Sequence, residues 1–467
     1  MQEEIGGILE SVRKHHELYA NALPMIASEN VTSNTVRTLL ASDLSHRYAE
    51  GEVGARFYQG CEFIDEIEAR AVKWAKELFG AEHANVKPIS GVNANIAAIF
   101  ALTSPGDKMM ALSVPDGGHI SHSEYSVPAI RNLKLERLPF DPAEMNIDAD
   151  KMARKIKEQK PALILLGCSL FLFPHPVREA REAVEEVADE VGTTVVYDAS
   201  HVLGLVAGKR FQDPLREGAE VVTSSTHKTF PGPQGAVILC NSKGKVGKTG
   251  EAGEAGEAGE AEEAGEAGEA GLRLKDKIDR AVFPGTVSNH HLHHVAGLAV
   301  ALVEMKHFGE AYAAQTVANA KALAQALHEA GFEVLCEHKG FTESHQVAVD
   351  VRGLGGGGRG ESGGDAVAKK LERAGIIANK NMLPCDKMPE KPSGVRFGVQ
   401  ELTRLGMQES EMLEIAALVR GALVEGRDEN KIREEVRELR KGFQEVLFCF
   451  DRDFDGKGAY NFSEALG

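Results

Sequence analysis

The sequence predicts an α/β fold in two parts: a large domain whose mostly parallel sheet is covered by helices, and a smaller α+β C-terminal domain. Short apolar, β-branched runs alternate with helical stretches from about residue 70 to residue 240, and this alternation is typical of crossover units in a parallel sheet. After residue 283, one long helical stretch precedes a few strands and shorter helices. We therefore expect an N-terminal arm and helix over 1–45, a large domain over 46–282, and a small domain with the C-terminal tail over 283–467.

The individual elements follow from the hydrophobic pattern. The N-terminal arm contains a helical stretch at GGILESVRKHHELYANAL (6–23). Runs with the length and composition of buried strands are HANVKPI (83–89), DKMMALSV (107–114), PALILLG (161–167), TTVVYD (193–198), AEVVTSS (219–225) and GAVILC (235–240). Helical stretches between them cover 71–80, 90–103, 149–160 and 177–192. In the small domain, a helix over 293–331 precedes strands FEVL (332–335) and HQVAVDV (345–351) and a helix over 363–375.

The chain is acidic, and its charge is unevenly distributed. With 53 Lys and Arg against 70 Asp and Glu, the formal net charge is −17. This balance argues against nucleic acid or a membrane surface as partner, because both are bound through an excess of basic side chains. Eight glutamates lie in the low-complexity stretch 250–271, and without them the net charge is −9. We interpret residues 244–271 as a solvated acidic insert in the large domain.

The cysteine pattern, the N-terminal residues and the apolar runs favour a location in the cytoplasm. Six cysteines are scattered along the chain without a C-x-x-C pair, which is typical of reduced thiols. The N-terminal residues MQEEIGGILE lack the basic and apolar regions of a signal peptide. The longest apolar run, LILLGCSLFLFP (163–174), is too short to span a bilayer. We therefore expect a cytoplasmic protein.

Three features of the large domain indicate one site at the carboxyl ends of its strands. Asp198 ends the strand TTVVYD, Lys228 follows the strand AEVVTSS, and Ser90 and Gly91 open a helix after HANVKPI. In an open parallel sheet, such residues face one crevice. Pyridoxal 5′-phosphate (PLP) chemistry needs a lysine for the cofactor aldehyde, a carboxylate for the pyridine nitrogen and a helix N-terminus for the phosphate. Each feature alone is weak evidence, because an Asp at this position is usually a helix cap and a Lys is usually a loop residue.

Ordered motifs give the chain a resemblance to a known family. They are IASENVTS, HRYAEGEVGARFYQGCEFID, PISGVNAN, DGGHISH, YDASHVLGL, SSTHKTFPGPQGA, FPGTVSNHHLHHVAG and SGVRFGVQELTRLGM. From about residue 20 to about residue 450, outside the acidic repeat, the chain resembles the serine hydroxymethyltransferases, and its spellings look archaeal. The resemblance implies a fold-type-I PLP-dependent transferase. It would interconvert serine and glycine reversibly and pass the one-carbon unit to a reduced pterin.

The resemblance also implies roles for residues at matching positions. The cofactor would be held by Ser90, Gly91, Asn95, His119, Asp198, His201, Ser225, His227, Lys228 and, from the neighbouring subunit of a homodimer, Gly285. Groups that would act in catalysis are Lys228 as Schiff-base lysine, Asp198 at the pyridine nitrogen, His119 stacked on the ring, His201 near the cofactor oxygen, Tyr58 near the cofactor and Glu50 for proton transfer. Arg396 would clamp the substrate carboxylate, beside Ser28 and Tyr48.

Departures from the family pattern leave alternatives open. Val92 stands where a hydroxyl residue is common, Phe57 replaces a tyrosine, and Cys385 replaces residues that contact folate in bacterial relatives. The carrier is therefore open between tetrahydrofolate and tetrahydromethanopterin. A pterin-independent aldolase for threonine or another β-hydroxy amino acid would use the same Lys228 and Arg396. A non-catalytic PLP-fold binding module is a third hypothesis.

Two motifs suggest metal sites, and we expect neither to bind one. His290, His293 and His294 have helical spacing but no accompanying carboxylate or cysteine cluster. The tail DRDFDGKGAYNFSE (451–464) begins like a calcium loop, but its twelfth position is Phe462 where a calcium loop needs Glu. We interpret this tail as solvated and acidic.

Overall fold

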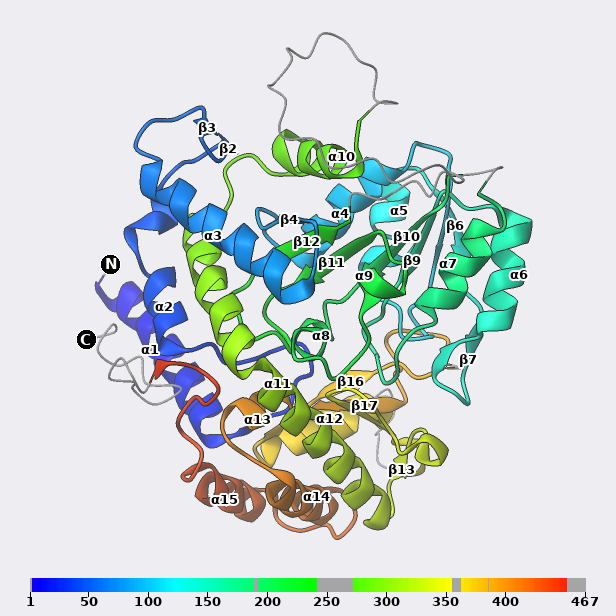
Figure 1. The fold of residues 1–467 in the computed structure, drawn as a ribbon. Coiled ribbons are helices and arrows are strands. Elements are labelled where there is room, and N and C mark those ends of the chain that lie inside the picture. Colours follow the sequence, from blue (N-terminus) through cyan, green and yellow to red (C-terminus); the bar gives the residue numbers. More distant parts are fainter. Residues whose placement is uncertain (1, 189–191, 242–271, 355–362, 385, 452–467) are drawn as a thin grey trace.

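A computed structural model describes residues 2–188, 192–241, 272–354, 363–384 and 386–451 (Figure 1). The acidic repeat, most of the glycine-rich run at 352–364, Cys385 and the tail after Asp451 lie outside the described residues. The centre of the fold is a seven-stranded sheet of order β4-β12-β11-β10-β9-β5-β6. Its strands are β4 (His83–Asn85), β5 (Lys108–Ala111), β6 (Lys134–Arg137), β9 (Leu163–Leu166), β10 (Thr194–Asp198), β11 (Val221–Ser225) and β12 (Ala236–Cys240).

The sheet is mostly parallel, which confirms the predicted α/β class. Pairs β5–β6, β5–β9, β9–β10 and β10–β11 are parallel, whereas β12 is antiparallel to both of its neighbours, β11 and β4. Strand β6 was not predicted from the sequence, because its residues KLER are polar and half-exposed at the sheet edge. The other six strands lie within the predicted apolar runs.

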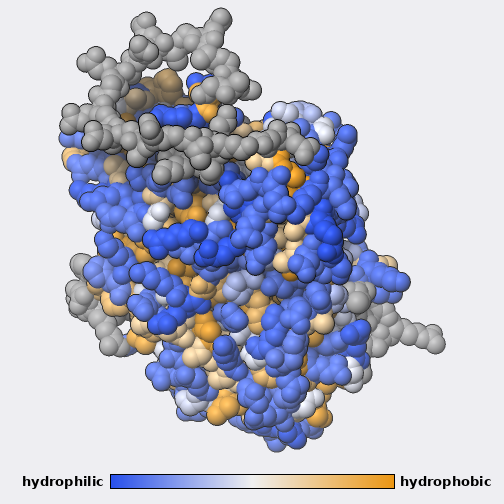
Figure 2. All heavy atoms as spheres, turned by 45° about the vertical axis from the view of Figure 1, so that its right-hand side comes forward, coloured by the Kyte–Doolittle hydropathy of each residue, from blue (hydrophilic) through white to orange (hydrophobic). Residues whose placement is uncertain are grey.

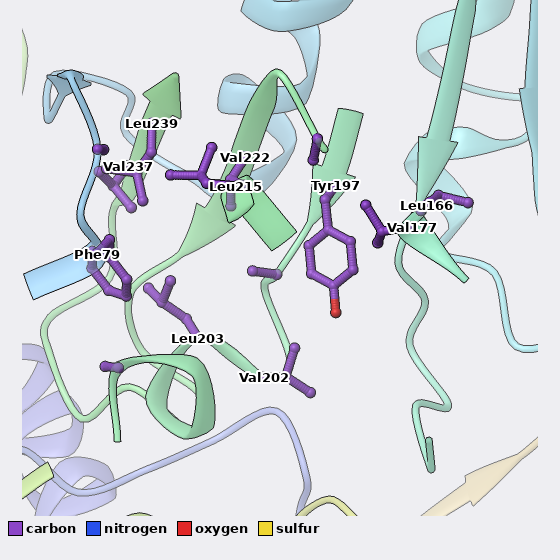
Figure 3. Close-up of a cluster of buried hydrophobic side chains, with 14 of the residues drawn as sticks. Phe79, Leu166, Val177, Tyr197, Val202, Leu203, Leu215, Val222, Val237 and Leu239 are labelled. Carbon is purple, nitrogen blue, oxygen red and sulfur yellow. The ribbon is translucent and has the colours of Figure 1, made fainter. Parts of the chain in front are cut away.

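Both faces of the sheet are buried. Successive residues of one strand belong to different cores: Ile164 and Leu166 pack on one side, and Leu163 and Leu165 on the other. Figure 3 shows part of the first core, where Tyr197 lies among apolar side chains from neighbouring strands and helices. This burial explains why the strands are continuous apolar runs rather than alternating ones.

Helices cover the two faces. The first core contains residues of α3 (Glu62–Phe79), α6 (Ala149–Gln159), α7 (Val177–Glu185), α8 (Leu203–Ala207) and the first half of α11 (Leu292–Glu329). The second core contains residues of α4 (Gly91–Leu102), α5 (Val127–Ile130), α10 (Leu274–Arg280) and the irregular π-helical turn η4 (Ala281–Thr286). Shorter elements around this sheet are β2 (Gly51–Glu52), β3 (Ala55–Arg56), η2 (Ile120–His122), β7 (Phe140–Asp141), β8 (Asn146–Ile147) and α9 (Pro214–Glu217).

A second sheet of four strands, ordered β13-β14-β17-β16, forms the C-terminal part of the fold. Its antiparallel strands are β13 (Glu333–Val334), β14 (Gln346–Asp350), β16 (Asn379–Asn381) and β17 (Gly394–Gly398). Helices α12 (Gly363–Arg373), α14 (Glu409–Leu423) and α15 (Glu429–Arg440) share its core with the end of α11. The remaining elements here are η5 (Glu337–Lys339), η6 (Arg352–Leu354), β15 (Ile376–Ile377) and α13 (Gln400–Arg404).

The N-terminal arm lies against the C-terminal part rather than apart from it. Helix α1 (Gln2–Asn21) contacts α15, and β1 (Leu23–Pro24) pairs with β15. Helix α2 (Asn34–Leu40), followed by the turn η1 (Asp43–His46), packs on α11. Because α11 contributes its first half to the large core and its second half to the small one, the change between the two cores falls inside that helix. The predicted division at residue 283 stays a prediction.

The start of the acidic tail differs from the prediction of a solvated segment. Asp451 is buried, and its carboxylate accepts hydrogen bonds from the backbone N–H groups of Asn34 (2.7 Å) and Thr35 (3.1 Å) at the start of α2. A carboxylate at a helix N-terminus satisfies amides that have no partner within the helix. The expectation was therefore wrong for Asp451.

The surface is mixed in polarity. The face shown in Figure 2 is mostly hydrophilic, with apolar side chains in small groups among the polar ones. None of the described helices combines the length and apolar character needed to cross a membrane.

Candidate active site

The site begins where β10 and β11 end. Asp198, the last residue of β10, is in register with Thr223 of β11, and Lys228 lies three residues beyond the end of β11. Ser90 is the N-cap of α4, and its side chain accepts from the backbone N–H of Asn93 at 3.2 Å. Strand pairing and the α4 contact with β11 thus bring together three segments that the sequence predicted to converge.

Glycine at position 91 lets the start of α4 approach the strand ends closely. A Cβ atom there would lie 3.2 Å from Cβ of Ser225 and 3.3 Å from Oγ of Ser200, which is tighter than ordinary contact. A larger residue would therefore push α4 away from β11. The first amides of α4 thus lie beside the strand ends, where they can serve an anion.

The converging segments enclose a cavity of about 180 Å³. It is lined by Ser90, Gly91, Val92, Asn95, His119, Cys168, Ser169, Asp198, Ser200, His201, Ser225, His227 and Lys228. Nine of these thirteen residues are among the ten predicted to hold the cofactor; Gly285 is the tenth and does not line the cavity. Val92, where a hydroxyl residue was expected, also faces this space.

Asp198 is buried and fully paired. Its carboxylate accepts from Nδ2 of Asn95 (2.8 Å), Nε2 of His122 (3.1 Å) and the backbone N–H of Ser200 (2.9 Å). Burial opposes ionisation, but these hydrogen bonds and the nearby His122 outweigh it and lower the pKa of Asp198. The site therefore keeps a carboxylate charge at the floor of the cavity.

The buried environment of the Lys228 amine favours its neutral form. Nζ donates to Oγ of Ser225 at 2.6 Å. Burial lowers the pKa of Lys228 to about 8, with Asp198 opposing and Arg396 adding to the decrease. Burial also lowers the pKa of the adjacent His227 to about 4. The lysine can therefore be deprotonated near neutral pH, as a nucleophilic amine requires.

Two further histidines lie on the cavity wall. Burial, and then the electrostatic influence of His122, lower the pKa of His119 to about 4. Burial, followed by the charges of Arg396 and Lys228, lowers the pKa of His201 well below its usual value. Both imidazoles are thus neutral at pH 7.

Arg396 comes from the other sheet, on β17. Its guanidinium donates to the carbonyl of Ser169, which lines the cavity, and its Nε donates to Oδ1 of Asn379 at 3.2 Å. Burial lowers the pKa of Arg396 to about 10, so the group stays charged at pH 7. Its position beside the cavity suits a substrate carboxylate.

Ser28 belongs to a loop that reaches the same region. Two residues later, Asn30 donates from Nδ2 to the backbone carbonyl of Lys228 at 2.7 Å. One residue earlier, the carbonyl of Ala27 lies 3.0 Å from Nε2 of His345. Ser28 itself is half-buried between these two anchors.

Four predicted site residues lie elsewhere, in what we call the Tyr48–Tyr58 patch: Tyr48, Glu50, Tyr58 and Gly285, together with Phe57. The ring centroids of Tyr48 and Tyr58 are 4.9 Å apart, and those of Phe57 and Phe283, the latter in η4, are 6.1 Å apart. Glu50 accepts a hydrogen bond from Ser288. Desolvation and then the charge of Glu50 raise the pKa of Tyr58. The single chain does not bring this patch into the Lys228 cavity.

A buried charge network supports the patch from beneath. Arg56 bonds to Asp65 (2.7 Å) and Glu68 (2.8 Å) and donates to the carbonyls of Ala49 and Gly51, on either side of Glu50. Nε2 of His290 lies 3.0 Å from Glu68. Although burial opposes it, the His290 hydrogen bond and the Lys87 charge lower the pKa of Glu68 to about 2.

Sequence reasoning missed several residues of the site. His122 follows His119 by three residues in the motif DGGHISH, and this spacing was the only signal for it. Asn30 and Gln346 act through single hydrogen bonds to Lys228 and His201, so no local pattern marks them.

The histidine cluster has protein partners of its own. His290 pairs with Glu68, and Nδ1 of His294 bonds to the carbonyl of Gln234. Across the described ranges, no group of three or more His, Cys, Asp or Glu side chains is arranged to hold a metal ion.

Comparisons with known proteins agree with this geometry. The crystal structure of an L-threonine transaldolase from Pseudomonas fluorescens matches with a TM-score of 0.81 and 27% identity, covering 97% of this chain and 96% of that one. The protein is thus a fold-type-I PLP-dependent transferase, and the resemblance predicted this fold correctly.

The family follows from sequence comparison. The family profile described as serine hydroxymethyltransferase matches residues 2–419. Proteins of that name from Methanopyrus kandleri and Methanocaldococcus jannaschii are 55% and 54% identical, over 98% and 94% of this chain and 97% and 94% of their own length. The chain belongs to the serine hydroxymethyltransferase family, as its motifs predicted.

Proposed function

We propose that this enzyme interconverts serine and glycine and transfers the one-carbon unit to a reduced pterin. The observation that carries the proposal is one cavity lined by Asp198, which ends β10, and by Lys228, which follows β11, with Arg396 of β17 bonded to the Ser169 carbonyl in its wall. In the forward direction, the Cα–Cβ bond of serine breaks. The hydroxymethyl carbon passes to the pterin with loss of water, and Cα receives a proton to give glycine.

The cavity residues fit PLP. Lys228 has an amine that is neutral above about pH 8, Asp198 offers a permanent carboxylate, and the close approach at Gly91 leaves the first amides of α4 facing the strand ends. In our proposal, Ser90, Gly91 and Ser225 hold the phosphate, His119 covers the ring, and Asp198 meets the ring nitrogen. When bound, PLP supplies an electron sink for the carbanion formed at Cα.

The chain's own groups orient the substrate and handle protons. Arg396 binds the substrate carboxylate, because its buried guanidinium is charged and aimed at the cavity wall. Ser28 and Tyr48 complete the substrate site in the proposal. Glu50 takes the proton of the substrate hydroxyl or delivers one to the pterin.

The role of Glu50 requires a second copy of the chain. Tyr48, Glu50, Tyr58 and Gly285 are predicted site residues, yet they do not line the cavity of their own chain. We propose a homodimer in which the Tyr48–Tyr58 patch of each subunit completes the cavity of its partner. Its support is the exposure of Tyr48 (46%) and Tyr58 (44%) in a single chain.

A second candidate activity is pterin-independent cleavage of β-hydroxy amino acids such as threonine. The similarity to a solved L-threonine transaldolase favours it as an alternative. The non-catalytic alternative has no such support, because this chain belongs to an enzyme family and carries Lys228, Asp198 and Arg396.

A cytoplasmic location also remains part of the proposal. Its support is that the five described cysteines, Cys61, Cys168, Cys240, Cys336 and Cys449, are all free thiols.

The test is a comparison of carriers. Serine cleavage by the holoenzyme is measured without pterin, with tetrahydrofolate and with tetrahydromethanopterin, and threonine cleavage is measured alongside. The proposal expects one pterin to accelerate serine cleavage strongly. Equal serine cleavage in all three conditions, with threonine cleaved as fast, would establish the aldolase instead.

A further inference from the structure

Gln346 and His201 come from different sheets and meet beside the cavity. Gln346 is the first residue of β14 and is fully buried, and His201 follows β10 and lines the cavity. Nε2 of Gln346 lies 2.9 Å from Nδ1 of His201. The roles proposed above do not use Gln346.

The orientation of the Gln346 amide is fixed by two backbone groups. Its Oε1 lies 2.9 Å from the backbone N–H of Phe171, which can only donate. Its Nε2 lies 3.1 Å from the carbonyl oxygen of Ser169, which can only accept. Flipping the amide would set donor against donor and acceptor against acceptor, so the nitrogen faces His201.

A competing partner is excluded by the same reasoning. Nε2 of His345 lies 3.4 Å from Nε2 of Gln346, but also 3.0 Å from the carbonyl oxygen of Ala27. Because that carbonyl can only accept, Nε2 of His345 carries a hydrogen and cannot accept one. The two amide hydrogens of Gln346 therefore go to Ser169 and to Nδ1 of His201.

We propose that Gln346 is a positioning residue that holds His201 as the neutral tautomer with its proton on Nε2. A neutral imidazole has one donor and one acceptor nitrogen, so engaging Nδ1 as the acceptor leaves an N–H donor for the cavity. The ring stays neutral because burial and the facing groups Arg396, Lys228, His345 and His119 all disfavour its charged form.

The Gln346 amide is also linked to Arg396, the residue proposed to bind the substrate carboxylate. The carbonyl of Ser169 accepts from both Gln346 and Arg396, so one buried side chain orients His201 and the carbonyl that anchors Arg396. Two donors, the guanidinium and the His201 Nε2–H, then face an oxygen-bearing ligand. This consequence rests on the proposed function, whereas the tautomer does not.

The experiment measures the tautomer directly. Nitrogen chemical shifts of ¹⁵N-histidine are recorded on the full chain with and without PLP, and His201 is assigned from the signal lost in His201→Asn. The variants are Gln346→Leu and Gln346→Glu. Gln212→Glu is the matched control, because Gln212 is also a buried amide, and its partners are His175, Tyr197 and Glu217 rather than His201.

In the wild type we expect the Nε2–H form to exceed the Nδ1–H form by at least about tenfold, the ratio that one hydrogen bond sustains. Gln346→Leu should lower this ratio about tenfold. Gln346→Glu should move the proton to Nδ1, because a carboxylate there can only accept. Gln212→Glu should leave the ratio unchanged.

If the wild-type protein carries the His201 proton on Nδ1, that measurement alone overturns the proposal. Unchanged ratios in both Gln346 variants would overturn it as well. Because these shifts report on the ring and not on turnover, a negative result in the pterin comparison would leave the tautomer measurement standing. A KM for serine that rises in Gln346→Leu while Gln212→Glu matches the wild type would support the link to Arg396.

Discussion

The Lys228 cavity and the Tyr48–Tyr58 patch are built in opposite ways. In the cavity, functional side chains are buried and paired with one another, as Asp198 is with Asn95 and His122. In the patch, Tyr48 and Tyr58 are exposed and Glu50 is half-buried, and Arg56 fixes the backbone on either side of Glu50. A single chain therefore forms the Lys228 cavity by itself, whereas its Tyr48–Tyr58 patch lies outside that cavity.

The largest expected effect concerns the cavity. Lys228→Ala should lower turnover of serine by about 10³-fold or more, because no other described amine lines the cavity. Steady-state serine cleavage in the presence of pterin measures it. Lys209→Ala, at an exposed position, is the control and should match the wild type. Residual activity within tenfold of the wild type would remove Lys228 from the mechanism.

The support of the patch is the next target. Glu68→Gln removes the buried carboxylate that Arg56, Lys87 and His290 share, and we expect it to lower the free energy of unfolding by about 3 kcal/mol. The pKa of Glu68 is lowered to about 2, so its contribution is full above about pH 5 and is lost as the pH falls toward 2.

Denaturant unfolding at pH 7 and at pH 3 measures the Glu68 contribution. The loss caused by Glu68→Gln should be smaller at pH 3, because the wild type has then lost part of the same interaction. Glu66→Gln, at an exposed ion pair with Arg70, should change stability by less than about 1 kcal/mol. A larger loss at pH 3 than at pH 7 would contradict the charge assignment.

Mixing two inactive variants tests whether the regions belong to different subunits. Lys228→Ala damages only the cavity, and Glu50→Gln damages only the patch. In a statistical mixture, half of the dimers are mixed and each has one intact site, so about a quarter of wild-type activity should return. Activity is measured after joint unfolding and refolding. No recovery, with mixed dimers shown to be present, would place both groups in one subunit.

The depressed pKa of Lys228 predicts a pH dependence that belongs to the cavity alone. Because the neutral amine predominates above about pH 8, the rate at which the apoenzyme takes up PLP should rise about tenfold from pH 7 to pH 9. Absorbance of the bound cofactor follows the reaction. Glu50→Gln should show the same profile. A rate that keeps rising past pH 10 would mean an ordinary lysine.

The smallest effect lies outside both regions. Asp451→Ala removes the carboxylate that accepts from the first two amides of α2, and we expect a loss of about 1 kcal/mol in the free energy of unfolding. Asp451→Asn, which keeps an acceptor oxygen, should recover part of it. Thermal unfolding measures both. Wild-type stability in Asp451→Ala would show that these two hydrogen bonds contribute nothing to the free energy of unfolding.

The sequence predicted the cavity better than the patch for a physical reason. Strand ends in a parallel sheet converge by geometry, so the order of strands and helices along the chain suffices to place Asp198, Lys228 and Ser90 together. Tyr48, Glu50 and Tyr58 were recognisable only from motifs, because they lie outside the converging strand ends and no periodicity marks them. The division between the domains at residue 283 stays a prediction, and α11 runs without a break through both cores.

Single hydrogen bonds between residues far apart in the chain also could not be predicted from the sequence. Gln346 is 145 residues from His201, and Asp451 is 417 residues from Asn34. Such pairs arise from the final packing of elements and leave no local composition signal. The polar edge strand β6 was not predicted for a related reason. Its place in the sheet is set by pairing with its neighbour β5 and not by its own hydrophobicity.

The continuous helix α11 has a consequence for how the molecule comes apart. Its 38 residues extend roughly 57 Å, and apolar side chains from its two halves are shared between the two cores. Loosening either core would strip packing from one half of the helix, which is too long and too apolar to stand alone in water. Calorimetry should therefore record one cooperative transition for the monomeric unit rather than two.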